Sequence, residues 1–342
     1  MKSWSEILGH RRVLDVLSRA VASDRLHHAY LFTGPPGVGK ATVANALATV
    51  LNCDARPDGQ FAPDCTECSA CRRIAIRQHP DVLFVEPEPP SRIVKIDQIR
   101  DVQKASMSTP YEGRYRVVLI DNAHIMSEAA ANALLKTLEE PPDRTILILV
   151  TDGPHLLLDT IISRCQRIRF GSIDEAVVAD ALADLVAEDV DPDLLSIAAG
   201  YGEGSLGRSI SMLESGMLED RRDLLERILS LPAESTVQWL ELGDELGEKT
   251  ELLERRIDVL TVFFRDVMLF KRAESRRVVN ADLIDLVEAQ AQRFSVDAVL
   301  ALLEALMSAR RRLQHNVNPT LIAEDLLDRL RRPSTRALAP PA

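Results

Sequence analysis

A short segment between an apolar run and a helix-forming stretch has the composition of a phosphate-binding loop. It follows a buried strand predicted at 29–33 and opens a helix predicted at 40–51. In such a loop, glycines let backbone N–H groups turn toward phosphate oxygens, the helix N-terminus adds a favourable dipole, and a lysine reaches the outer phosphates. We therefore expect a nucleotide site at this point rather than a chance glycine-rich turn. The expected loop residues are Gly34, Pro35, Pro36, Gly37, Val38, Gly39 and Lys40.

Two positions near this loop lack the side chains that hydrolysis requires. The loop is followed by Ala41, where a serine or threonine hydroxyl would ligate Mg²⁺. Thr42 comes next, but one helical step turns a side chain by about 100°, so it is a poor substitute. Asp121 ends a predicted strand and is either a metal-associated carboxylate or a strand cap; Asn122 follows it, and an amide cannot take a proton from water. We expect the site to be able to bind ATP with Mg²⁺ but to hydrolyse it slowly.

Four of the five cysteines have the spacing of a metal site. Cys53, Cys65, Cys68 and Cys71 read C-x11-C-x2-C-x2-C. One long and two short loops can place four thiolates tetrahedrally around Zn²⁺, and four ligands leave no open position for catalysis. Disulfides or free thiols are the alternatives, and clustering in a cytosolic chain favours metal. We predict a structural zinc site, and we expect the remote Cys165 to be a small buried side chain.

Composition and charge restrict the class of protein. A chain of 342 residues exceeds one ordinary core, and 46% hydrophobic with 27% charged residues is typical of a globular protein. No apolar run is long enough to cross a bilayer and the N-terminus lacks a signal-peptide apolar region, so we expect a cytoplasmic protein without a membrane partner. A net charge of −11 disfavours binding to DNA by this chain alone, because Lys and Arg supply most phosphate affinity.

The first half of the chain must position these groups, and it alternates strand and helix signals. Continuous apolar runs predict buried strands, and such strands fit a parallel sheet covered on both faces. A helix predicted at 128–140 stops at a pair of prolines. The pattern predicts a doubly wound α/β fold. Besides the run at 29–33, the predicted strands are 82–85, 117–120 and 146–150.

The second half of the chain is expected to be helical. Strand signals end near residue 170, and residues 173–214 predict a small helical unit with a glycine-rich turn at 200–207. Residues 219–331 predict several long helices with broad leucine faces. The proline-rich tail, 332–342, is expected to be disordered.

Several segments resemble one family, the bacterial clamp-loader subunits of the AAA+ class. Residues 26–34, which lead into the phosphate-binding loop, resemble the segment that precedes this loop in the family. Residues 130–142 are the most specific match. The sequence Ser-Arg-Cys at 163–165 and the Asn-Val-Asn-Pro sequence at 316–319 are also similar, and the inserted four-cysteine module occurs in this family. The resemblance covers about residues 5–331.

This resemblance implies a fold and a domain organisation. An α/β P-loop AAA+ domain with a parallel sheet would occupy 1–170 and carry the zinc module at 53–71. A small helical lid would occupy 171–211. An all-α collar domain, used for oligomerisation, would follow at 212–331.

The resemblance also implies roles for three further residues. Arg164 would be an arginine finger that reaches a neighbouring subunit's γ-phosphate; the alternative is a surface ion pair. Thr151 lies at the sensor position after the 146–150 strand, or is a plain loop cap. Arg208 would be the sensor arginine of the lid, or only structural.

Within the family, gamma/tau subunits hydrolyse ATP, whereas delta-prime subunits often have degraded sites and act as a rigid stator. Ala41 and Asn122 favour the second group, although the loop itself is intact. The implied partners are gamma/tau-type and delta-type subunits in a hetero-oligomer, the sliding clamp, and primer–template DNA through the complex. An ATP-hydrolysing gamma/tau-type motor is the main alternative. A zinc-dependent DNA-binding module and a small-molecule P-loop kinase fit the sequence less well.

Overall fold

The computed structural model describes residues 3–55, 65–89, 91, 93–186, 190–231, 235–272, 274, 277–314 and 317–331. Its contacts divide the chain into two compact units. The first contains 1–181 with 204–207, and the second contains 182–203 with the residues from 208 onward.

The tail expected to be disordered lies outside the described residues, and the predicted domain boundaries stay predictions. Among the described helices, none is long and apolar enough to cross a membrane.

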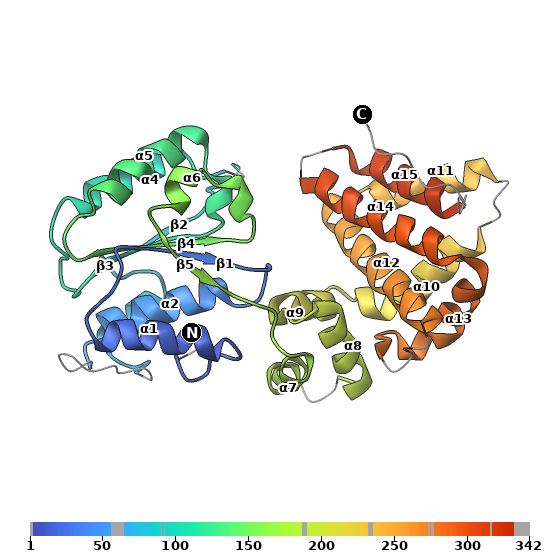
Figure 1. Cartoon of the computed structure of the whole chain (residues 1–342), viewed down its shortest axis with the longest axis horizontal. Coiled ribbons are helices and arrows are strands. Elements are labelled where there is room, and N and C mark those ends of the chain that lie inside the picture. Colours follow the sequence, from blue (N-terminus) through green and yellow to red (C-terminus); the bar gives the residue numbers. More distant parts are fainter. Residues whose placement is uncertain are drawn as a thin grey trace. The chain divides into compact units, whose positions relative to one another are not determined.

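A five-stranded parallel sheet forms the centre of the first unit (Figure 1), which confirms the predicted α/β class. Its strand order is β2-β3-β4-β1-β5, so β5 is an edge strand. Strands β1, β3 and β4 are buried along their whole length, as their continuous apolar sequences require. The strands are β1 (Ala29–Thr33), β2 (Val82–Val85), β3 (Arg116–Ile120), β4 (Thr145–Thr151) and β5 (Gln166–Arg169).

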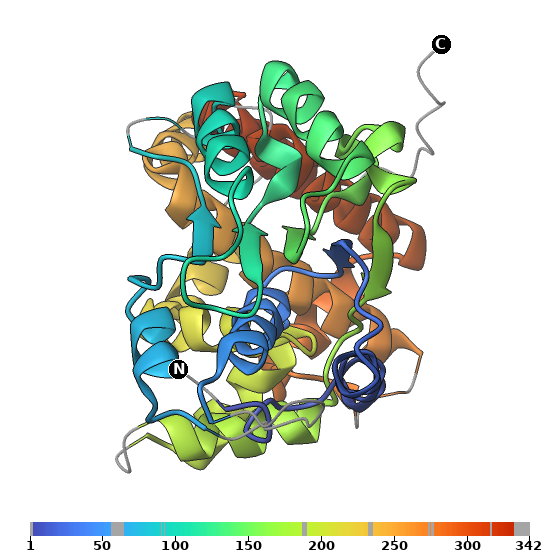
Figure 2. The same cartoon turned by 90° about the vertical axis from the view of Figure 1, so that its left-hand side faces the viewer.

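Helices cover both faces of this sheet (Figures 1 and 2). On one face, α1 and α2 bury apolar side chains against Tyr30, Phe32 and Ile168. On the other face, α4, α5 and α6 pack against the opposite side chains of the strands. Helix α5 begins where the Ser127 hydroxyl accepts a hydrogen bond from the Ala130 amide. The helices of this unit are α1 (Arg11–Ala22), α2 (Lys40–Asn52), α3 (Ser69–Ala75), α4 (Ile96–Ser106), η1 (Ala123–Ile125), α5 (Glu128–Glu139), η2 (Pro154–Leu156) and α6 (Asp159–Ile162).

A buried ion pair fixes the amino ends of β2 and β3. The fully buried Asp81 accepts from Arg116 Nη2 at 2.9 Å. It also accepts from the backbone amides of Tyr111, Glu112 and Gly113 at 2.8–2.9 Å. Burial alone would raise the pKa of Asp81, but these donors outweigh it and lower the pKa to about 2.

The second unit is helical in its described residues, as expected. Its core includes Phe263 and Phe264 on α12, and Phe264 makes an edge-to-face contact with Phe294. In a buried polar network, Asp266 accepts hydrogen bonds from Asn280, and the Asn280 side chain accepts a hydrogen bond from the Tyr201 hydroxyl at 2.8 Å. Helices α7 and α9 span a division between the two units. The helices are α7 (Glu175–Leu185), α8 (Pro192–Gly202), α9 (Leu206–Glu214), α10 (Met217–Ser230), α11 (Thr236–Gly247), α12 (Thr250–Lys271), η4 (Ala281–Leu283), α13 (Ile284–Arg293), α14 (Val296–Gln314) and α15 (Pro319–Arg331).

The predicted glycine-rich turn is present but shorter than expected, because it occupies only residues 203–205. Residues 200–207 were expected to form a glycine-rich turn, but α8 continues through Gly200 and Gly202, and only 203–205 separate it from α9. These two glycines serve close packing instead. A Cβ at Gly200 would lie 2.6 Å from the Val279 side chain, and one at Gly202 would collide with Ser209.

Candidate functional site

The predicted phosphate loop connects β1 to α2 and has a left-handed backbone at two glycines. Gly37 (φ 72°) and Gly39 (φ 102°) adopt conformations that favour glycine, and a Cβ at Gly39 would meet open space. Within the described residues, the N–H groups of Gly37, Val38 and Gly39 donate no hydrogen bond. Unpaired amides at the start of a helix form a concave site for an anion. The geometry of this loop therefore fits a phosphate group.

Lys40 is the first residue of α2 and is only 6% exposed. Its Nζ donates to the carbonyl oxygens of Gly34 at 2.8 Å and Pro35 at 2.6 Å. Burial lowers the pKa of Lys40, and the carboxylates of Asp152 and Asp121 oppose that shift. The ammonium group is thus held at the base of the loop by two carbonyls, and its expected contact with the outer phosphates stays a prediction.

Residues of the same unit that are distant in the sequence form hydrogen bonds with the loop. Ser205 Oγ donates to the carbonyl of Pro36 at 2.9 Å, and the Gly207 amide donates to the carbonyl of Gly37 at 3.0 Å. Because Gly207 has no side chain, its backbone can lie close to the loop; a Cβ there would lie 3.0 Å from Gly37 Cα. No local sequence pattern indicates these contacts, because they join residues about 170 positions apart.

The residues expected to assist hydrolysis lie at the carboxyl ends of β3 and β4. Asp121 accepts from the Asn122 amide at 2.8 Å, and burial raises its pKa. Asn122 is exposed and has a left-handed backbone (φ 49°), which asparagine tolerates better than most residues. Thr151 is the last residue of β4, and its hydroxyl lies 3.0 Å from His124 Nδ1.

Two members of this group, His124 and Asp152, were not predicted from the sequence. His124 Nε2 lies 3.3 Å from a carboxylate oxygen of Asp152. A single histidine in a 3-10 turn belongs to no recognisable sequence motif. The contact between His124 and Thr151 is therefore seen only in the folded structure. Ala41 offers no ligand atom, and Thr42 is exposed on α2.

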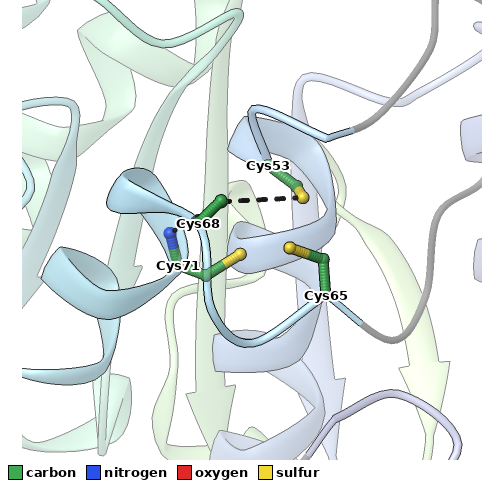
Figure 3. Close-up of side chains that lie close together, drawn as sticks. All are labelled: Cys53, Cys65, Cys68 and Cys71. Carbon is green, nitrogen blue, oxygen red and sulfur yellow. Dashed lines mark hydrogen bonds between the residues drawn. The ribbon is translucent and has the colours of Figure 1, made fainter.

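The four predicted metal ligands come together at the far end of α2 (Figure 3). Their sulfur atoms all lie within 4.8 Å of one another, and those of Cys53 and Cys68 are 3.9 Å apart. A tetrahedral site with Zn–S bonds of about 2.3 Å requires sulfur separations of about 3.8 Å. Cys53 caps the C-terminus of α2, and Cys68 caps α3 by accepting from the Cys71 amide. This cluster can therefore bind a metal ion.

The thiols of this cluster have strongly different environments. Burial raises the pKa of Cys53 to about 11 and that of Cys71 further. A hydrogen bond from the Cys68 backbone lowers the pKa of Cys65 to about 7. A bound cation would stabilise all four thiolates, because it replaces the water that burial removes. Cys165, expected to be buried, is only half-buried and lies apart from the cluster.

Arg164 lies between α6 and β5, at the opposite end of the sheet from the phosphate loop. Its Nη2 contacts Glu139 Oε1 at 2.7 Å and its Nη1 donates to the Thr160 carbonyl at 3.0 Å, while 35% of the side chain stays exposed. It borders a pocket of about 430 Å³, the Arg164 pocket. The lining residues are Arg25, Leu26, His27, Ser163, Arg164, Cys165 and Gln166.

Arg208 belongs to the second unit, where two acids hold it. Its guanidinium lies 3.0 Å from Glu203 and 3.6 Å from Asp258. These ion pairs give it a structural role in that unit, and its role as a sensor stays a prediction.

The fold and site define a P-loop protein of the AAA+ class, with a parallel five-stranded sheet and a helical C-terminal part. Residues 9–174 match the family "DNA polymerase III, delta subunit", and residues 215–332 match "DNA polymerase III, delta subunit, C terminal". The chain is 30% identical to the DNA polymerase III subunit delta' of Bacillus subtilis, over 95% of this chain and 97% of that one. The chain belongs to this delta-prime family of clamp-loader subunits.

Tau subunits of the same polymerase are also similar. The Bacillus subtilis tau subunit is 31% identical over 79% of this chain, and the Escherichia coli tau subunit is 35% identical over 63%. The chain spans about half of the first protein (50%) and a third of the second (33%).

Proposed function

We propose that this chain is the stator of a sliding-clamp loader, which helps to place the clamp on primed DNA and lends Arg164 to a neighbouring ATPase subunit. One observation carries the proposal. The chain has a complete phosphate loop but, at Ala41 and Asn122, neither a hydroxyl for Mg²⁺ nor a base for water. At the other end of the sheet it offers an arginine at the surface. A subunit built in this way contributes to hydrolysis in a partner's site.

ATP would be held in the chain's own site by the loop amides and by Lys40. The triphosphate would supply negative charge facing the loop amides, and Asp121 is the carboxylate proposed to hold Mg²⁺. The amide of Asn122 can orient a water molecule but cannot deprotonate it. Thr151 would sense the nucleotide only through a hydroxyl that already contacts His124.

The metal in the cysteine cluster is proposed to be Zn²⁺ with a structural role. Four thiolates suit zinc and leave no position for a substrate. The cluster joins the end of α2 to the start of α3. Zinc would thus anchor the helix whose first residue is Lys40.

The proposed partners follow from membership of the family. The helical segment 212–331 would assemble with gamma/tau-type and delta-type subunits, and the complex would bring the chain to the clamp and to primer–template DNA in the cytoplasm. A gamma/tau-type motor is the second candidate, because two tau subunits are among the relatives. It would require Thr42 to ligate Mg²⁺, and the exposed position of Thr42 on α2 disfavours this.

Clamp loading by a reconstituted loader tests the proposal. Loaders lacking this chain, or carrying Arg164→Ala, should place the clamp on primed circular DNA slowly. Glu139→Ala is the matched control, because it removes the ion-pair partner and leaves the arginine in place. Normal loading without the chain would overturn the stator role. Normal loading with Arg164→Ala, in a complex shown to be fully assembled, would overturn the role of the arginine.

A further inference from the structure

A second pocket lies on the first unit between α1 and the edge strand β5. Its volume is about 390 Å³, and we call it the β5 pocket. Its apolar lining comes from Val13, Val16 and Ile168, and Val16 is 39% exposed. Its polar lining consists of three exposed arginines: Arg12, Arg167 and Arg169.

The backbone of β5 has a free side next to this pocket. Strand β5 pairs with β1 and ends the sheet. The Phe170 amide donates to the Thr33 carbonyl at 2.7 Å. Because alternate residues of a strand direct their backbone groups to opposite sides, those of Arg167 and Arg169 point away from β1. Such a row of backbone groups can pair with an added strand.

The arginines around this edge have no partners in the described part of the chain. Arg12, Arg167 and Arg169 form no hydrogen bond or ion pair there, whereas some other exposed arginines do, such as Arg222 with Asp285 at 3.1 Å. Side chains alternate along a strand, so with Ile168 facing the α1 side, Arg167 and Arg169 leave from the other face. Arginines thus flank the free edge on both faces.

The position of Arg12 is unfavourable for the helix that carries it. Arg11 and Arg12 occupy the first turn of α1, which contains no acidic residue. The helix dipole disfavours cations at this end. Stability of the chain alone does not explain arginines there, whereas an external acidic partner would.

We propose that the β5 pocket and the free edge of β5 bind an acidic, extended segment of the neighbouring ATPase subunit. The segment would add a strand to the sheet beside Arg167 and Arg169, place apolar side chains against Val13 and Val16, and pair its carboxylates with the arginines. This inference rests on the proposed function. Gln166 lines the Arg164 pocket and begins β5, so the partner reached by Arg164 would meet this edge next.

Binding of the purified full chain to the loader's ATPase subunit tests this inference. The double variant Arg12→Glu/Arg169→Glu should raise the dissociation constant by about 10-fold or more. It should also make the dissociation constant less dependent on salt concentration. The matched control is Arg144→Glu, an exposed arginine with no ion pair among the described residues. Hydrogen exchange resolved to single amides should show residues 167 and 169 protected only in the complex, a readout that needs no variant.

Unchanged affinity of the double variant, together with unprotected amides, would overturn the docking surface. Protection that appears only when primed DNA is added would also overturn it, in favour of a nucleic-acid ligand. If Arg164→Ala still slows clamp loading in either case, the proposed function stands without the docking surface. If Arg164→Ala has no effect either, both fail.

Discussion

The two ends of the parallel sheet differ in how firmly their charged side chains are held. At the carboxyl ends of its strands, Lys40 is tied to carbonyls of its own loop, and the Thr151 hydroxyl contacts His124. At the amino ends of β1 and β5, Arg25 has no ion pair in the described residues and Arg164 is partly exposed beside an open pocket. Phosphate binding depends on backbone geometry, whereas hydrolysis depends on single side chains. One end can therefore keep a nucleotide-binding scaffold while the other serves a partner.

Loss of the proposed metal should have the largest effect, and it should act at the amino end, because the cluster lies next to Asn52 at the end of α2, which hydrogen-bonds to Tyr115 just before β3. Structural zinc contributes about 10–16 kcal/mol of apparent binding free energy in small zinc domains. Cys68→Ser should abolish binding of about one Zn²⁺ per chain and loosen residues 65–75 and the end of α2. Metal analysis and hydrogen exchange measure both effects, with Cys165→Ser as the control that keeps its metal. A metal-free wild-type chain that is fully folded would contradict this prediction.

Loss of the buried ion pair should destabilise the amino end next most strongly. Asp81→Asn leaves the Arg116 guanidinium buried without a counter-ion, which costs about 3–5 kcal/mol. Asp97→Asn removes an exposed pair with Arg100 and should cost under about 1 kcal/mol. Urea unfolding measures both changes. Equal costs would show that the buried network does not hold the strands.

Acid should remove part of the same contribution. The pKa of Asp81 is about 2 in the folded chain, below its ordinary value of 3.8. Its contribution to the free energy of unfolding, about 2 kcal/mol, is therefore complete above about pH 4 and is lost as pH falls toward 2. Unfolding measured from pH 6 to 2 should show this loss in the wild type and a smaller one in Asp81→Asn. Identical pH profiles would refute the assignment.

Restoring catalytic groups should have the smallest effect. Ala41→Ser with Asn122→Glu adds a Mg²⁺ ligand and a base, and should raise ATP turnover of the isolated chain modestly. Glutamate at position 122 meets a left-handed backbone and loses about 1 kcal/mol of stability. The control Ala41→Ser/Asn122→Gln has similar strain but no base. Equal turnover by both variants would show that other groups limit hydrolysis.

The sequence predicted those features that have local patterns. Continuous apolar runs located β1 to β4, and fixed spacing located the phosphate loop and the four cysteines. Strand β5 was missed because its four residues contain only one apolar side chain, Ile168, which is typical of an edge strand.

Features that depend on folding were not predictable from one sequence. Asp81 and Arg116 are 35 positions apart, and Ser205 reaches Pro36 across 169. The turn predicted at 200–207 was too long, because Gly200 and Gly202 relieve crowding between packed elements and only Gly204 lies in the turn. The pairing of Arg164 with Glu139 likewise joins α5 to the segment before β5. In the isolated chain Arg164 thus forms the surface ion pair that was the alternative, and its role as a finger stays a prediction.

The steady-state ATPase rate of the reconstituted loader tests the contrast between the two ends most directly. Three loaders would be compared with clamp and primed DNA present, carrying the wild-type chain, Lys40→Ala or Arg164→Ala. An arginine finger contributes about 10³–10⁵ in rate at a single site, so Arg164→Ala should silence one interface of the ring. Lys40→Ala should match the wild type, because we expect the chain's own site to hydrolyse little ATP. A rate that falls with Lys40→Ala and not with Arg164→Ala would contradict the account.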